Sequence, residues 1–105
     1  MSFDRGRHAA TVHRPALRNQ RREYLEALQA AAEARPEFGG RIVERHGIPV
    51  LHVIRDGFQA MEIACDYARS AWWFTRQDDG RTIAPADDID GAVRAIVHQS
   101  EGARA

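Results

Sequence analysis

The sequence predicts an α+β fold, a two-layer sandwich in which an antiparallel sheet of four to five strands is flanked by an N-terminal and a C-terminal helix. Two observations predict it. Apolar residues recur at helical spacing near both ends of the chain, and alternating apolar segments joined by short turns fill the middle. Strands joined by short hairpins form antiparallel sheets, which commonly pack one face on the core and leave the other more solvated. Helices gathered on one face of such a sheet give the α+β class.

The first helix is expected to begin at Pro15, because proline lacks the amide hydrogen that would be unpaired at a helix start. Pro36 and the pair Gly39-Gly40 are expected to end it. An apolar stripe gives this helix its buried side, and its members are Leu17, Tyr24, Leu25, Leu28, Ala31 and Ala32.

The second helix is expected over residues 86–99. Asp87 is the predicted N-cap, and Asp88 and Asp90 favour the positive end of the helix dipole. The buried stripe of this helix consists of Ile89, Ala92, Val93, Ile96 and Val97.

Five short segments between the helices are predicted to be strands, and the last is a short edge strand. Their expected ranges are 41–46, 49–55, 59–66, 71–76 and 81–84. With 105 residues, the chain is expected to form a single domain over 15–100. A flexible basic arm (1–14) is expected to precede it, and a disordered tail (101–105) to follow it.

The second and third strands are predicted to pair through a three-residue loop, Asp56-Gly57-Phe58. This register places His52 directly opposite Glu62, on the face that does not carry Leu51. A two-residue loop at Asp56-Gly57 would shift the pairing by one residue. The first register is preferred because it separates the apolar residues better.

Two adjacent tryptophans, Trp72 and Trp73, must point to opposite faces of the fourth strand. Trp72 and Phe74 are expected on one face, and Trp73 on the other. The second face then also carries Val50 and Ile54, which makes it apolar for a solvated face. We expect a buried surface there.

Composition excludes several classes of protein. The formal net charge is zero, so no overall field draws the chain to nucleic acid or membrane. The single cysteine, Cys65, cannot form an intrachain disulfide. No apolar run approaches the roughly 18 residues of a membrane span, and the N-terminus lacks the apolar segment of a secretory signal. A cytoplasmic protein is therefore expected.

Few residues are candidates for chemistry, and neither a cofactor nor a metal is predicted. Cys65 and His52 fall on opposite faces in the preferred register, so Cys65 is interpreted as a small buried hydrophobe. His52 and Glu62 form a candidate polar site, either an acid–base pair or an ordinary cross-strand contact. The aspartates near residue 88 lack the spacing of a calcium loop and are interpreted as helix caps.

An arginine-rich segment precedes and enters the first helix. Nucleic-acid contact is a possible role for Arg14, Arg18, Arg21 and Arg22. The alternative is an ordinary solvated helix face, which the zero net charge favours.

Several core and turn segments together resemble short uncharacterised α+β proteins of actinobacteria. They are the runs 48–53 (Ile-Pro-Val-Leu-His-Val), 72–74 (Trp-Trp-Phe) and 85–89 (Pro-Ala-Asp-Asp-Ile), together with Cys65 and Gly80. The resemblance covers residues from about 17 to 99. It implies a compact α+β domain and an actinobacterial source, and it carries no catalytic residue.

The preferred functional hypothesis is a non-catalytic protein-interaction or regulatory module that acts as a homodimer. Val50, Ile54 and Trp73 are its expected interface anchors. One alternative is a nucleic-acid-binding regulator that uses the arginine-rich helix. Another is a small-ligand binder with a pocket between helix and sheet and with His52 and Glu62 at its mouth.

Overall fold

The computed structural model describes residues 19–104 and shows the expected α+β fold. An N-terminal helix over 19–33 leads into a five-stranded antiparallel sheet, and a second helix closes the chain. The elements after the first helix are β1 (Phe38–Arg45), β2 (Ile48–Arg55), β3 (Phe58–Ala68), β4 (Ala71–Arg76), β5 (Thr82–Pro85) and α2 (Ile89–Arg104). The predicted basic arm (1–14) and helix start at Pro15 lie outside the described residues.

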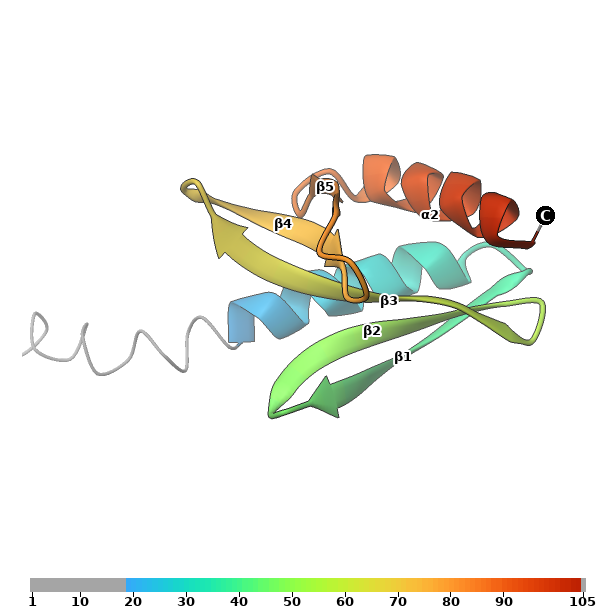
Figure 1. Cartoon of the computed structure of the whole chain (residues 1–105), viewed down its shortest axis with the longest axis horizontal. Helices are drawn as coiled ribbons and strands as arrows, with labels where there is room; N and C mark the ends of the chain where they lie inside the picture. The colour runs from blue at the N-terminus through green and yellow to red at the C-terminus, as the bar shows by residue number, and fades with distance from the viewer. Residues whose placement is uncertain (1–18, 105) are drawn as a thin grey trace, which may run out of the picture.

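The sheet is a meander in which every strand pairs with its neighbour in sequence, in the order β1-β2-β3-β4-β5 (Figure 1). The first strand begins three residues earlier than predicted, and β3 continues to Ala68. Within the described part of the chain, no helix is long and apolar enough to cross a membrane.

One face of the sheet and both helices share a single hydrophobic core. The predicted alternation is confirmed, because Leu51, Ile63, Cys65 and Phe74 are all 0% exposed and belong to one cluster. The helices contribute Leu25, Leu28, Ala92 and Ile96 to that cluster. Both helices therefore cover the same face of the sheet.

The β2–β3 hairpin combines the two registers that the sequence left in competition. Its turn has two residues, Asp56 and Gly57, so the predicted three-residue loop is wrong. A register shift next to Ile54 then restores the preferred pairing, in which His52 is opposite Glu62. A β-bulge of this kind adds one residue to one strand, and here the added residue is Ala60.

Three of the hairpin turns place both central residues in the left-handed region. His46-Gly47 has φ values of 56° and 79°, and Asp56-Gly57 has 52° and 84°. The β3–β4 turn, Arg69-Ser70, has 52° and 63° without a glycine. Positive φ at both positions defines a type I′ turn, which matches the twist of the flanking strands and strongly prefers Asn-Gly or Asp-Gly.

The C-terminal helix differs from the prediction at both ends. Its N-cap is Asp88 rather than Asp87, because the Asp88 carboxylate accepts a hydrogen bond from the Gly91 amide at 3.0 Å. Its last residue is Arg104, so residues 101–104 of the predicted disordered tail are helical. Ser100 is 1% exposed and accepts a 2.7 Å hydrogen bond from Arg55 Nη1, which ties this end of the helix to β2.

Candidate functional site on the helix-free face

The second face of the sheet carries every strand residue that the sequence marked as a candidate. We call it the helix-free face, because neither described helix packs on it. The pairing registers place on this face Arg41, Val43, Arg45, Val50, His52, Ile54, Glu62, Ala64, Asp66, Trp73 and Thr75.

The centre of the helix-free face is buried without any helix over it. Val50 is 1% exposed and Ala64 is 6% exposed, although neither belongs to the core cluster under the helices. Val50 therefore lies on this face but offers almost no exposed area to a partner. Ile54 and Trp73 are half-buried, as is Val43 opposite Val50.

A polar cluster lies beside this apolar centre. Glu62 accepts hydrogen bonds from Arg45 and contacts His52, with 3.1 Å between Glu62 Oε2 and His52 Nδ1. The side chains of His52 and Glu62 are only 17% and 15% exposed. The guanidinium of Arg45 is the main cause of a lowered pKa at Glu62. The predicted cross-strand contact is thus present, and Arg45 joins it as a third member.

One alternative hypothesis placed these two residues at the mouth of a pocket between helix and sheet, and the structure does not place them there. His52 and Glu62 point away from the helices. A hollow on the helix side, at one end of the sheet, is lined instead by Tyr24, Tyr67, Ser70, Ala71, Trp72 and Asp87.

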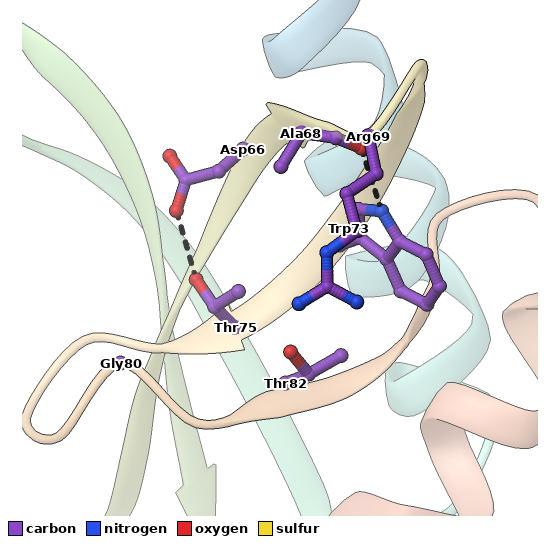
Figure 2. A pocket seen from close by; sticks show the side chains of 7 residues that line it. All are labelled: Asp66, Ala68, Arg69, Trp73, Thr75, Gly80 and Thr82. Carbon is purple, nitrogen blue, oxygen red and sulfur yellow. Dashed lines mark hydrogen bonds between the residues drawn. The ribbon is translucent and has the colours of Figure 1, made fainter.

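A separate hollow of about 250 Å³ opens on the helix-free face near the β3–β4 turn (Figure 2). Trp73 forms one wall, and its indole Nε1 donates a 3.0 Å hydrogen bond to the Ala68 carbonyl. Thr75 donates to Asp66 Oδ2 at 3.0 Å across the floor. The full lining consists of Asp66, Ala68, Arg69, Trp73, Thr75, Gly80 and Thr82.

Arg69 and Asp66 are the two charged residues of this hollow, and sequence analysis missed both. Figure 2 shows the Arg69 side chain among the residues that line the hollow, which include Trp73 and Thr82. Among residues 19–104, no carboxylate forms an ion pair with Arg69. The sequence carried one signal that could have pointed to Arg69. The pair Arg69-Ser70 joins two strands through a type I′ turn, although such a turn prefers Asn-Gly or Asp-Gly.

Cys65 lies on the opposite face, as predicted. It is 0% exposed, and its burial raises the pKa of the thiol to about 12. A thiol that stays protonated and buried is neither a nucleophile nor a metal ligand at neutral pH.

The two described members of the arginine-rich segment serve the fold. Arg21 Nε donates a 2.7 Å hydrogen bond to the Cys65 carbonyl, and its guanidinium lies 5.7 Å from the centre of the Trp72 ring. Arg22 forms an exposed ion pair with Glu44 at 3.7 Å. Arg14 and Arg18 lie outside the described residues.

Fold and site together define a class of protein: a two-layer α+β domain with one bare sheet face that carries a polar cluster and an open hollow. Among the residues that the structure describes, no three histidine, cysteine or acidic side chains gather as metal ligands would. No family model, curated protein or solved structure matches this chain.

Proposed function

We propose that this chain is a non-catalytic interaction module that acts as a homodimer. The two copies join through the outer edges of β1, and the helix-free faces form one binding surface with Ile54 and Trp73 as its anchors. Val50 lies on the same face but is buried, so it offers almost no contact area. The difference between the two edges of the sheet carries the proposal.

The two edge strands of the sheet, β1 and β5, differ in length and in the regularity of their pairing. β5 has four residues, begins beside a register shift and ends at Pro85, all of which blunt an edge. β1 has eight residues in one unbroken register with β2 and contains no proline. No described strand pairs with its outer side. Long regular edges of this kind recruit another strand.

The backbone groups available on β1 can be identified by alternation. The Glu37 carbonyl accepts a hydrogen bond from the Asp56 amide, so odd-numbered residues face β2. Alternate residues of an antiparallel strand direct their N–H and C=O groups to opposite sides. Gly40, Ile42 and Glu44 therefore face outward. The Gly40 carbonyl already accepts a 3.0 Å hydrogen bond from the Gln29 side chain, so the Glu44 amide of a second copy must share or displace this contact.

A second copy of β1 complements this edge. An antiparallel pair centred on Ile42 sets Ile42 against its own copy, Arg41 against Val43 and Gly40 against Glu44. No like charges are then directly opposite, whereas a shift that centres the pair on Arg41 would oppose two guanidinium groups. A two-fold axis perpendicular to the sheet produces this pairing and keeps both helix-free faces on the same side.

The test is the molar mass in solution, measured by size-exclusion chromatography with light scattering. We expect a dimer for the natural sequence and a monomer for Glu44→Pro, because proline removes an outward amide and blocks the approaching strand. Glu44→Ala is the matched control. It removes the same exposed ion pair with Arg22 but keeps the amide, and it should remain dimeric.

Circular dichroism establishes that each variant is folded. A natural chain that is monomeric across micromolar concentrations would overturn the homodimer. A Glu44→Pro variant that stays dimeric would show that the copies meet elsewhere. In that case the helix-free face itself is the next surface to examine, beginning with Trp73.

A further inference from the structure

The hollow on the helix-free face has the composition of a binding site for a small organic anion. We propose that it binds a carboxylate attached to a flat ring, with the carboxylate on Arg69 and the ring against Trp73. This inference deepens the proposed function by naming a ligand class for its binding surface, and it does not depend on how the copies assemble.

Arg69 supplies the anion-binding group. A guanidinium binds a carboxylate through two parallel hydrogen bonds, and such charge-assisted pairs are the strongest polar contacts in proteins. In most of the described chain, arginines are already engaged: Arg21, Arg45, Arg55 and Arg76 all bond to carbonyl or carboxylate groups. Arg69 lies at the hollow without such a partner (Figure 2).

The turn that carries Arg69 has an energetically unfavourable backbone conformation. The φ of Arg69 is 52° and that of Ser70 is 63°, a conformation that costs ordinary residues about 1–2 kcal/mol each. The other two turns of this type use glycine at the second position. His46 and Asp56 adopt nearly the same positive φ as Arg69, so the feature peculiar to this turn is Ser70, a non-glycine residue at the second position. Strained backbone of this kind is found next to binding sites.

Trp73 supplies a flat wall. The hydrogen bond from its indole nitrogen to the Ala68 carbonyl fixes the ring relative to the turn that carries Arg69. A planar group stacked on this ring gains dispersion and apolar burial. The volume of about 250 Å³ suits a ligand with a single ring.

Asp66 selects among anions. Its carboxylate lines the same hollow, where Oδ2 accepts the hydrogen bond from Thr75 and Oδ1 lies 4.0 Å from the Arg21 guanidinium, which offsets part of its charge. A second negative charge on the ligand would be repelled by this group, so a monoanionic carboxylate is favoured over a doubly charged phosphate monoester. Thr82, whose hydroxyl lies at the rim, offers a further hydrogen-bond donor.

The experiment is a titration of the full chain with three probes, followed by the amide and indole signals in nitrogen–proton NMR spectra. The probes are benzoate, phenyl phosphate and benzyl alcohol. We expect benzoate to shift the Trp73 indole signal with a millimolar dissociation constant, and the other two to bind at least about tenfold more weakly.

Two variants test the role of Arg69. Arg69→Asn suits a type I′ turn, so it should fold at least as well as the natural sequence and yet bind benzoate at least about tenfold more weakly. Arg41→Asn removes another arginine of the same face that has no ion pair among the described residues, and it should bind benzoate normally. Trp73→Ala should abolish binding.

Several outcomes would overturn the inference. Equal binding of benzyl alcohol would reduce the hollow to apolar packing on Trp73, and stronger binding of phenyl phosphate would replace the carboxylate with a phosphate. Unchanged binding by Arg69→Asn would exclude Arg69 as the anion site, and no shift with any probe would remove the site altogether. Glu44→Pro should still bind benzoate, so a failed homodimer and a failed ligand site give different results.

Discussion

The two faces of the sheet differ in how deeply their side chains are buried, and two adjacent residues show the contrast. Phe74 is 0% exposed beneath the helices, whereas Trp73, the next residue toward the N-terminus, is half-buried on the helix-free face. On the covered side, half-buried arginines bind backbone carbonyls, as Arg21 does at Cys65 and Arg55 does at Val97. These contacts connect helices to strands and stabilise the fold.

The helix-free face uses the same residue types differently. Arg45, on β1, bonds across β2 to the Glu62 carboxylate on β3, and Arg69 lies at an open hollow. Trp73 makes its polar contact within one hairpin, with the Ala68 carbonyl. These contacts join strands or lie within one hairpin, and none of the three residues is used here to connect the sheet to a described helix. Burial and the partners of the contacts, rather than residue type, distinguish the two faces.

The largest expected effect compares truncation of the two neighbouring aromatic side chains. Phe74→Ala should lower the free energy of unfolding by about 3–5 kcal/mol, because it removes a fully buried ring and leaves a cavity. Trp73→Ala should cost less, although tryptophan is larger, because its ring is already partly in water. Urea denaturation of both variants measures the difference. An equal or larger loss for Trp73→Ala would mean that the helix-free face also carries the core.

A smaller effect is expected at the turn beside the hollow. Ser70→Gly should raise the free energy of unfolding by up to about 1 kcal/mol, because glycine adopts positive φ without steric cost. It should leave benzoate binding unchanged, since it keeps Arg69. Thermal and urea unfolding measure the gain, and Gly57→Ala, at the equivalent position of the neighbouring turn, should show the opposite sign. A loss of stability in Ser70→Gly would show that the turn is not strained.

The fold was predictable because its signals are periodic. Alternation along β2 and β3 fixed which residues share a face, and it placed His52 opposite Glu62 before any coordinates were known. The turn length was predicted wrongly because Ala60, the bulged residue, has no property that distinguishes it from its neighbours. The helix cap was missed by one position, since Asp87 and Asp88 are equally good capping residues and only the backbone path decides between them.

The site was less predictable because it depends on three-dimensional shape. Val50 was expected to offer contact area, yet it is 1% exposed. The hollow is formed by β3, β4 and β5 together, and the lining residues Arg69 and Thr82 look like ordinary surface residues in the sequence. Periodicity reports which way a side chain points, but not how closely its neighbours surround it.

The smallest effect concerns the polar cluster and is expected at acidic pH. Arg45 lowers the pKa of Glu62 below its usual value of 4.5, so the ionised carboxylate stabilises the folded state above that pH. This contribution is lost as the pH falls through the lowered pKa, because the folded protein must then take up the proton. Since Arg45 is largely solvent-exposed, we expect at most about 1 kcal/mol.

Glu62→Gln should therefore show a weaker loss of stability than the natural sequence between about pH 4.5 and pH 3, with little difference in slope above pH 5. Urea unfolding across this range measures the slope. Glu44→Gln makes the same chemical change on the edge strand β1, where the carboxylate is 62% exposed. If both variants changed the acid slope equally, the contact with Arg45 would contribute nothing specific, and the polar cluster would be no more than an exposed ion pair. A flatter slope in Glu62→Gln alone would show that the helix-free face, although uncovered by helices, supports its own partly desolvated electrostatics.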